Sequence, residues 1–243
     1  SRGRYIATQA CRAASNGAAF LADVKKATGL DFEIISPAEE ARLSVRGCIE
    51  LLDPDAEAGL VFDIGGGSTE ISWIVADGAR PRVAAWASFP LGVVNLSEAW
   101  GGREISVETY ERLVESVRVR FRDHGDPAGL RPVFERGGAH VLGTSGTVTS
   151  IAGVHLNLQR YRRDLVDGLW ISRGEAAAVT ERLRAMDFEA RAAEPCIGVE
   201  RADLVVCGCA ILDALLREWP AERIRVADRG LREGILADLL EAV

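Results

Sequence analysis

The chain has 243 residues, of which 48% are hydrophobic and 27% are charged, and its formal net charge is −7. This composition excludes wholesale disorder, and the length suits one large or two modest domains, each able to bury a core. The acidic balance argues against a protein that binds nucleic-acid duplexes or anionic membranes over a broad surface. An anionic ligand must therefore be held locally, by backbone N–H groups, a metal ion or a few arginines.

The ends of the chain and its cysteines bear on the cellular setting. No apolar run reaches the roughly 18 residues of a membrane-spanning helix, and no secretory signal opens the sequence. The chain begins Ser1-Arg2-Gly3-Arg4 without methionine, so we expect it to be part of a longer protein. The five cysteines are Cys11, Cys48, Cys196, Cys207 and Cys209. They form no regular framework or metal-binding pairs, which favours reduced thiols in a cytoplasmic protein.

Strands and helices alternate along most of the sequence. Strands are predicted at 4–8, 32–35, 60–64, 70–76, 83–89, 139–142 and 224–226. Helices are predicted over 13–24 (ending before Gly29), from Ser36, from Ser106 to Phe121, after 147, from Ser172, over 203–216 and from Leu231. The alternation predicts an α/β fold. The three consecutive strands between 60 and 89, with turns at 65–69 and 77–78, exclude a purely doubly wound sheet.

The helix that begins at Ser36 has an unusually complete set of start signals. Ser36 is the expected N-cap, Pro37 occupies the first helical position, and Glu39 is placed to close a capping box. The segment Asp53-Pro54-Asp55 ends this unit. Because the character of the sequence changes after it, we expect this segment to be a hinge.

The strongest chemical signal is the segment Asp63-Ile64-Gly65-Gly66-Gly67-Ser68-Thr69-Glu70. Its three glycines leave backbone N–H groups free to converge on an anion, and Ser68 and Thr69 add hydroxyl donors. The flanking carboxylates, Asp63 and Glu70, are suited to hold a divalent cation directly or through water. The loop leads into a strand and lacks a following Gly-Lys-Ser/Thr, so it is neither a dinucleotide fingerprint nor a Walker loop. A tight glycine hairpin with two solvated carboxylates is the alternative.

A second glycine segment, Gly143-Thr144-Ser145-Gly146-Thr147, lies between a predicted strand and a predicted helix. Its N–H groups and the helix N-terminus make a ready anion site. The alternative is a helix cap that happens to contain two glycines. Two such loops in one chain favour a substrate that carries several phosphates.

The neighbouring glutamates Glu39 and Glu40 have different predicted roles. Adjacent helical residues point about 100° apart, so the two side chains cannot share a face. With Glu39 assigned to the capping box, Glu40 is free to face a cleft as a general base for water, and a solvated surface glutamate is the alternative. Arg12 is either a phosphate contact or an exposed helix residue. The three histidines, His124, His140 and His155, share no metal-ligand spacing.

Taken in order, these segments resemble the exopolyphosphatase / guanosine pentaphosphate phosphohydrolase (Ppx/GppA) family, which belongs to the superfamily of actin, sugar kinases and chaperone ATPases. The matching segments are Thr8 to Arg12 with Asn16 and Phe20, Ile34 to Leu43, Asp63 to Glu70, Gly143 to Thr147, Glu200 to Asp203 and Gly230 to Gly234. The resemblance implies an actin-like (ribonuclease H-like) two-domain α/β fold. It divides the chain into a partial first domain, 1–45 plus 231–243, and a nearly complete second domain, 46–230.

The resemblance also implies an activity and a site. It implies a Mg²⁺-dependent hydrolase that releases the terminal phosphate of inorganic polyphosphate or guanosine pentaphosphate. Glu40 would be the general base, Asp63 and Glu70 would position Mg²⁺, and positions 65–69, positions 143–147 and Arg12 would bind phosphates. Family members begin with a first phosphate loop that has no counterpart in this sequence. We therefore expect a partial first domain with an unpaired strand edge, where a second copy of the chain would pair as a homodimer.

Two other functions fit some of these features. An ATP-using relative of the kinase or chaperone type would share the loop design, but it would transfer phosphate to a second substrate. A binding module would keep the loops without turnover, which is consistent with the missing first loop. Phosphate release and its dependence on Glu40 would separate the hydrolase from both.

Overall fold

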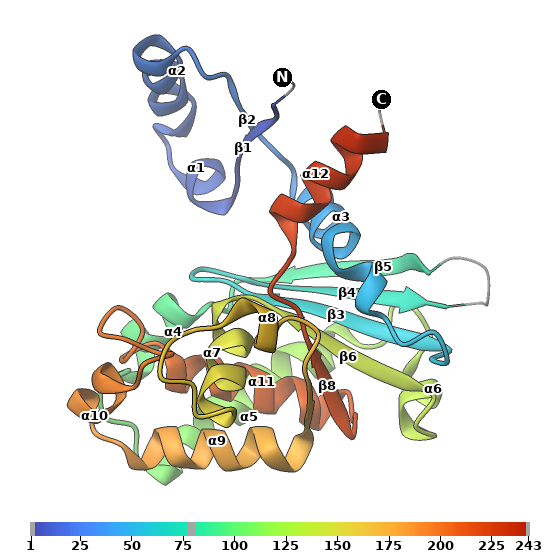
Figure 1. Cartoon of the computed structure of the whole chain (residues 1–243), viewed down its shortest axis with the longest axis vertical. Helices are drawn as coiled ribbons and strands as arrows, with labels where there is room; N and C mark the ends of the chain where they lie inside the picture. Colours follow the sequence, from blue (N-terminus) through green and yellow to red (C-terminus); the bar gives the residue numbers. More distant parts are fainter. Residues whose placement is uncertain (1–2, 77–80, 242–243) are drawn as a thin grey trace.

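Six strands form one mixed sheet in the order β5-β4-β3-β6-β8-β7 (Figure 1). They are β3 (Ala58–Ile64), β4 (Thr69–Val75), β5 (Arg82–Phe89), β6 (Ala139–Thr144), β7 (Trp170–Ser172) and β8 (Arg223–Val226). β3, β4 and β5 are antiparallel neighbours, β6 runs parallel to β3 and β8, and β7 is antiparallel to β8. The computed structural model describes residues 3–76 and 81–241, so the predicted turn at 77–78 lies outside the described residues.

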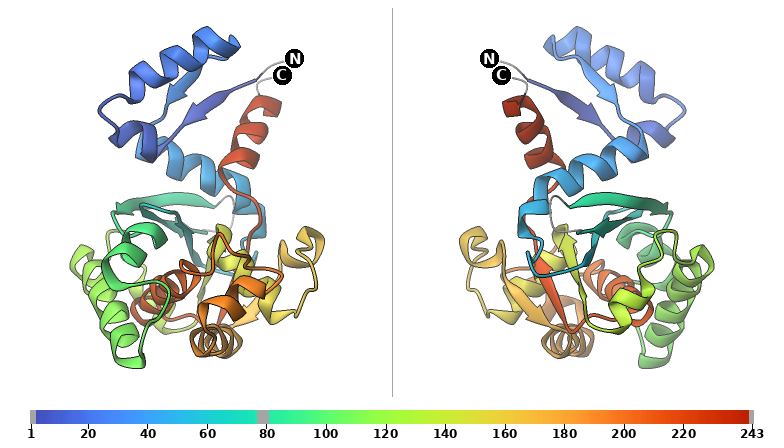
Figure 2. Two further views of the ribbon diagram at one scale, coloured as in Figure 1. Left: turned by 90° about the vertical axis from the view of Figure 1, so that its left-hand side faces the viewer. Right: turned by 90° about the vertical axis from the view of Figure 1, so that its right-hand side faces the viewer.

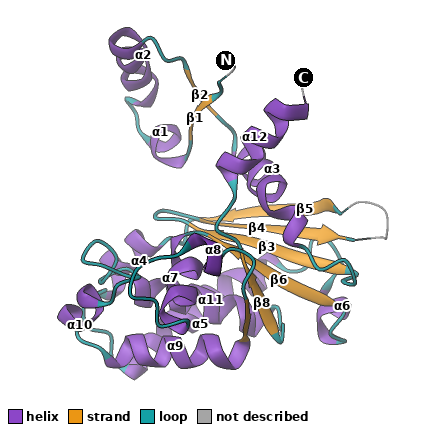
Figure 3. Cartoon of the chain, viewed as in Figure 1, coloured by secondary structure: helices purple, strands orange, loops and turns teal. Residues whose placement is uncertain are grey.

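Helices cover the two faces of this sheet unequally (Figure 3). The helices between β5 and α12 (Leu231–Glu241) are α4 (Val93–Trp100), α5 (Val107–His124), α6 (Arg131–Glu135), α7 (Gly146–His155), α8 (Arg163–Val166), α9 (Arg173–Ala185), α10 (Phe188–Ala193) and α11 (Val205–Glu218). Of these, α5, α7, α9 and α11 gather on one face, and α3 (Pro37–Cys48) and α12 lie on the other. The predicted α/β class is confirmed.

Alternation along β3 assigns its side chains to two cores. Leu60 and Phe62 belong to the large core under α5, α7 and α11. Val61, between them, belongs to a second core with Val45 and Cys48 of α3. Because β3 is buried on both faces, its sequence reads as a nearly continuous apolar run, interrupted only at Asp63.

The N-terminal segment forms a small unit that stands apart from the large sheet (Figure 2). Its elements are β1 (Tyr5–Ala7), α1 (Gln9–Ala13), α2 (Gly17–Thr28) and β2 (Phe32–Ile34), and β1 pairs parallel with β2. The helix predicted over 13–24 is present as α2 from Gly17, but Ala13 belongs to the separate α1, because the chain turns back between the two helices. A side chain at Gly17 would meet the carbonyl of Cys11 at 1.9 Å, so the two helices approach as closely as only glycine permits. Gly29 ends α2 in the left-handed conformation, as predicted.

Helix α3 is shared between the small unit and the large sheet. Near its start, Leu43 packs with Ile35 and with Ile235 of α12. Near its end, Val45 and Cys48 pack on the large sheet. The division of the chain into 1–45 plus 231–243 and 46–230 stays a prediction, and in the structure this boundary falls inside one continuous helix.

The predicted hinge at 53–55 is fastened to the large sheet. The Asp53 N–H donates to Nε2 of His140 in β6 at 2.9 Å, and the Asp53 carboxylate pairs with Arg223 of β8 at 2.8 Å. The short 3-10 helix η1 (Ile49–Leu51) joins α3 directly to this turn. The segment therefore does not separate α3 from the sheet, and long-range contacts that the sequence pattern does not contain fix it in place.

His140 should make the protein sensitive to acid. Burial lowers the pKa of His140 to about 4, although the charge of Asp53 opposes the shift, whereas an unfolded histidine titrates near 6.5. The unfolded state therefore binds the proton more readily, so this contribution to stability is complete above pH 6.5 and is lost as the pH falls toward 4. We expect the free energy of unfolding to fall by up to about 3 kcal/mol over this window, and His140→Gln should make this fall smaller. Urea unfolding at several pH values measures both slopes, and equal slopes would contradict the prediction.

The crossing of α3 and α12 should tolerate no added methyl group. A side chain at Gly234 would meet the carbonyl of Leu43 at 2.0 Å. We expect Gly234→Ala to lower the free energy of unfolding by about 1–3 kcal/mol, because the helices must move apart. Gly174→Ala in α9 is the matched control, since nothing lies within 4 Å of the new methyl group. Denaturant unfolding that ranks the two variants equally would contradict this account.

Candidate active site

Two predicted metal ligands and a hydroxyl meet where three strands come together. Asp63 at the end of β3 lies directly opposite Glu70 on β4 and Thr144 on β6 in the sheet register. Ser88 of β5 donates its hydroxyl hydrogen to Glu70 at 2.8 Å. The hairpin that contains the glycine loop thus brings Asp63 and Glu70 side by side.

The electrostatics of this pair suit a cation. Burial, the charge of Glu70 and the charge of Glu40 raise the pKa of Asp63 to about 6, and a hydrogen bond from Thr144 opposes the shift. Carboxylate oxygens are the donors that Mg²⁺ prefers, and a cation would relieve the repulsion between them. Within the described ranges, no three His, Cys, Asp or Glu side chains group as a metal site. Two carboxylates in register suit a cation such as Mg²⁺, which usually binds through one or two carboxylates.

Glu40 reaches the same region from the first turn of α3. Arg12 of α1 donates to its Oε2 at 3.1 Å and to the Ile35 carbonyl at 2.7 Å. Burial raises the pKa of Glu40, the Arg12 contact opposes the shift, and the charge of Glu70 adds to it. Glu40 is therefore no solvated surface residue, and its side chain is only 17% exposed. Arg12 is engaged with Glu40 rather than standing free for a phosphate.

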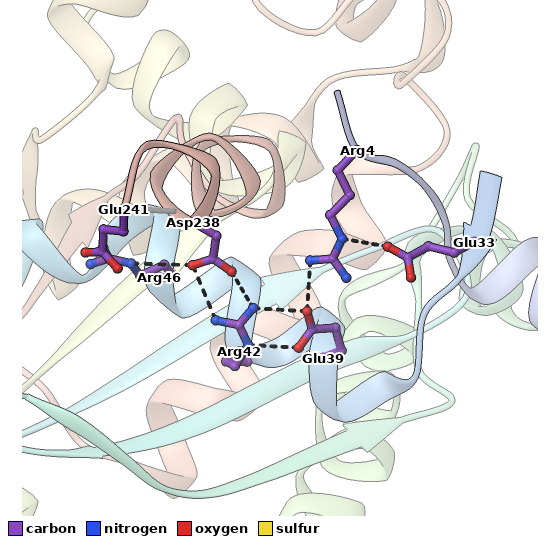
Figure 4. Close-up of polar contacts among 7 residues, drawn as sticks. All are labelled: Arg4, Glu33, Glu39, Arg42, Arg46, Asp238 and Glu241. Carbon is purple, nitrogen blue, oxygen red and sulfur yellow. Dashed lines mark hydrogen bonds and ion pairs between the residues drawn. The ribbon is translucent and has the colours of Figure 1, made fainter. Parts of the chain in front are cut away.

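Glu39 does not close the predicted capping box. The Ser36 hydroxyl does accept the Glu39 N–H at 3.2 Å, as the N-cap prediction required. The carboxylate of Glu39, however, pairs with Arg4 and Arg42, at 3.0 Å and 2.8 Å (Figure 4). Two arginines compete more strongly for the carboxylate than one backbone amide does, so half of the predicted box forms. At the start of α9, by contrast, Ser172 and Glu175 form a complete capping box.

The first glycine loop is held by its carbonyls, which leaves amides for a ligand. The carbonyls of Gly65, Gly66 and Gly67 accept from Val93 N–H, Val94 N–H and the Asn95 side chain at the start of α4. Throughout the described part of the chain, the amides of Gly66 and Gly67 have no acceptor, and both residues are exposed. These two amides are the loop's available donors.

Two of the predicted loop donors are already committed to the fold. The Gly65 amide donates to the Ser68 carbonyl at 2.8 Å and closes the turn. The Thr69 hydroxyl is buried and donates to the Leu91 carbonyl at 2.5 Å, so the expectation that it offers a free donor is wrong. Ser68 is 8% exposed. The sequence could not reveal the Thr69 contact, because Leu91 lies 22 residues away.

The second glycine segment is a sharp turn of one residue. Gly143 and Thr144 belong to β6, α7 begins at Gly146, and Ser145 between them has a φ of 96°. The buried hydroxyl of Ser145 has no hydrogen-bond partner among the described residues. A strained backbone and an unpaired donor at a helix N-terminus fit an anion site. Thr147 instead packs against Gly208 in the interior.

The sequence motifs assign no individual role to Arg201, although this residue lies at the second glycine segment. Its guanidinium covers Gly146, where an added Cβ would lie 3.2 Å from it, and donates to the Ser150 hydroxyl at 3.2 Å. Arg201 and Gly146 both line a pocket of about 510 Å³, which reaches Asp63, and a smaller one of about 130 Å³ beside Gly66. A cation at the junction of both loops is suited to phosphate. Arg201 lies far from this loop in the sequence, and the resemblance marked only its segment, Glu200 to Asp203, without a role for the side chain.

Of the remaining histidines and cysteines, Cys196 lines the pocket of about 510 Å³, and the others line neither pocket described above. His124 stacks on Trp73 and contacts Phe89, and His155 lies 3.8 Å from Glu175. All five cysteines are free, as predicted. Burial raises the pKa of Cys207 and of Cys209 to about 12, which leaves these thiols unreactive near neutral pH.

A mixed sheet with two glycine turns and converging carboxylates defines an α/β enzyme that acts on phosphate groups. The model of the Ppx/GppA phosphatase family matches residues 2–243, and the chain belongs to that family. It is thus a phosphatase, and the resemblance read from the motifs is confirmed. Among the described residues, no helix combines the length and apolar character needed to cross a bilayer.

Solved structures of this family have the same fold. The family member from Aquifex aeolicus matches with a TM-score of 0.80 and 26% identity, over 98% of this chain and 74% of that one. An exopolyphosphatase-like protein matches with a TM-score of 0.84 and 26% identity, over 98% and 77%. An exopolyphosphatase from Cytophaga hutchinsonii, 23% identical over 99% and 75%, shares the fold with a TM-score of 0.77. The predicted actin-like (ribonuclease H-like) α/β class is the fold of these structures.

The contact with Arg12 should set the charge state of Glu40. Removal of the guanidinium in Arg12→Met should raise the pKa of Glu40 further, because burial then acts without an opposing cation. Arg12→Lys keeps the charge and should show a smaller rise. Carboxyl ¹³C NMR titration measures the shift, and a Glu40 pKa that is unchanged in Arg12→Met would contradict the geometry.

Proposed function

We propose that the protein hydrolyses a terminal phosphoanhydride bond, with Glu40 as the general base that activates water. The convergence of Glu40 with Asp63 and Glu70 carries the proposal. Glu40 lies on α3, whereas Asp63 and Glu70 lie on the large sheet. The charges of Glu40 and Glu70 nevertheless both raise the pKa of Asp63. Like charges held this close favour a bound cation that balances them.

The environment of Glu40 suits proton transfer. A carboxylate whose pKa is raised by burial accepts a proton more readily than an exposed one, and efficiency is greatest when the pKa approaches the working pH. Arg12 keeps the carboxylate ionised and oriented. Water attack on a terminal phosphate needs little more from the protein than positioning and charge neutralisation.

The cofactor of this proposal is Mg²⁺, held by Asp63 and Glu70. Mg²⁺ usually binds through one or two carboxylates, and waters and substrate phosphates complete its ligands. When bound, it would neutralise phosphate charge. The protein's own part is to keep Asp63 and Glu70 in register across the β3–β4 hairpin.

The substrate phosphates would lie along the two glycine turns. The free amides of Gly66 and Gly67 and the Ser145 hydroxyl are uncharged donors, and Arg201 adds one cation. This arrangement agrees with a net charge of −7, because it needs no broad basic surface. Two family structures are described as an exopolyphosphatase and an exopolyphosphatase-like protein, which supports inorganic polyphosphate as substrate. Guanosine pentaphosphate presents the same terminal bond, and the cytoplasm would supply either compound.

Loss of the Glu40 carboxylate should abolish turnover without unfolding the protein. Glu40→Gln in the complete protein should lower kcat for phosphate release about 10²–10⁴-fold, the usual contribution of a general base. Thermal unfolding checks that the fold is kept. Glu98→Gln, an exposed glutamate on α4, is the matched control and should keep the wild-type rate. Undiminished release by Glu40→Gln would overturn the proposal.

Binding of Mg²⁺ should depend on both strand carboxylates. Asp63→Asn and Glu70→Gln should each weaken Mg²⁺ binding in calorimetry, because each removes one charged oxygen donor. Asp23→Asn, which changes an exposed residue of α2, should bind Mg²⁺ as the wild type does. Equal affinities in all four proteins would place the ion elsewhere.

A further inference from the structure

A continuous chain of ion pairs crosses the helix that carries Glu40 (Figure 4). Its seven members are Arg4, Glu33, Glu39, Arg42, Arg46, Asp238 and Glu241. Arg4, just before β1, contacts Glu33 of β2 at 2.6 Å and Glu39 of α3 at 3.0 Å. We call these residues the α3 ion-pair chain.

The second half of this chain ties α3 to the C-terminal helix. Arg42 contacts Glu39 at 2.8 Å and Asp238 of α12 at 2.5 Å. Arg46, one turn further along α3, lies 3.8 Å from Asp238 and also pairs with Glu241. The α3 ion-pair chain therefore runs without a break from the small sheet, across α3, to α12.

We propose that Glu39, Arg42 and Asp238 are positioning residues for Glu40, which fix the first turn of α3 between the small sheet and α12. The inference rests on the proposed role of Glu40 as the base. It assigns a task in the reaction to Asp238, which lies on α12 and makes its ion pairs with Arg42 and Arg46.

The geometry at the start of α3 supports this assignment. Glu39 and Glu40 are consecutive, and arginines from the same N-terminal segment hold both: Arg4 contacts Glu39, and Arg12 contacts Glu40. Adjacent helical side chains diverge by about 100°, so the two arginines approach the turn from different directions. A rotation or tilt of this turn would have to break one contact or the other.

The placement of Glu40 relative to the large sheet makes this restraint matter. The base lies on α3, whereas Asp63 and Glu70 lie on β3 and β4. Leu43 gives the first half of α3 an apolar contact with α12, but apolar contacts are not directional. The ion pairs add directional contacts at the exact turn where the base sits.

The α3 ion-pair chain is partly exposed, which makes it sensitive to salt. The side chains of Glu39, Arg42 and Asp238 are 27%, 48% and 29% exposed. Single exposed pairs contribute little, whereas a connected network with a shared arginine holds a geometry better. Added salt screens such contacts. Salt should therefore lower kcat at saturating substrate, apart from any effect on substrate binding.

The test measures kcat and KM for phosphate release from inorganic polyphosphate in the complete protein. Asp238→Asn should lower kcat about tenfold, as a displaced catalytic group does, with a smaller change in KM. Its kcat should also respond less to added salt than the wild-type value. Asp238→Glu restores the charge and should recover kcat. Glu39→Gln with Asp238→Asn should be less harmful than the product of the single effects, because both act through Arg42.

Asp31→Asn is the matched control, since it breaks an exposed ion pair with Lys25 at 2.7 Å that has no link to α3. It should keep the wild-type kcat and salt response. A wild-type kcat and salt response in Asp238→Asn would overturn the inference, as would a lowered unfolding temperature with unchanged kcat. If Asp238→Asn gives such a result while Glu40→Gln is inactive in the same assay, the positioning role fails but the proposed function stands. If Glu40→Gln turns over normally, the proposed function itself fails.

Discussion

Three carboxylates held together against their mutual repulsion are the constraint around which this structure is organised. Asp63 and Glu70 are neighbours because the β3–β4 hairpin fixes their register, and Glu40 reaches them from the first turn of α3, a helix whose later residues pack on the same sheet. Burial makes their charges more costly, which is why the pKa values of Asp63 and Glu40 are raised. The fold must hold these carboxylates against their repulsion, and a bound cation would relieve that repulsion.

The glycine turns supply the complementary half of the site. In the first, α4 holds the loop carbonyls while Gly66 and Gly67 stay exposed. In the second, Ser145 lies between β6 and α7, and its buried hydroxyl has no partner among the described residues. Gly92 is as necessary as the loop glycines, because an added Cβ there would meet the Gly66 carbonyl at 2.2 Å. In the proposed function, a few fixed dipoles and Arg201 would bind phosphate without a broad basic surface.

Local patterns predicted much of this, and partners distant in sequence account for most of what they missed. The Ser36 N-cap, the Gly29 stop and the glycine segments rest on residues within a few positions of each other, so their motifs are readable. Glu39 pairs with Arg42, three residues later, and with Arg4, 35 residues earlier, and Asp53 is held by His140, 87 residues later. The split between α1 and α2 depends on the close approach of Gly17 to Cys11, which apolar periodicity does not record. The residues themselves suggested a cation site at Asp63 and Glu70 and a candidate base at Glu40, the family resemblance favoured these roles, and the fold adds that the three are neighbours.

The central claim is that water, activated beside these carboxylates, attacks the terminal phosphorus of a phosphoanhydride. Turnover of inorganic polyphosphate in ¹⁸O-labelled water tests it most directly, with the products resolved by mass spectrometry. The account predicts one ¹⁸O atom in each released phosphate and none in the shortened chain. Label in the shortened chain, or unlabelled phosphate passed to another acceptor, would contradict it.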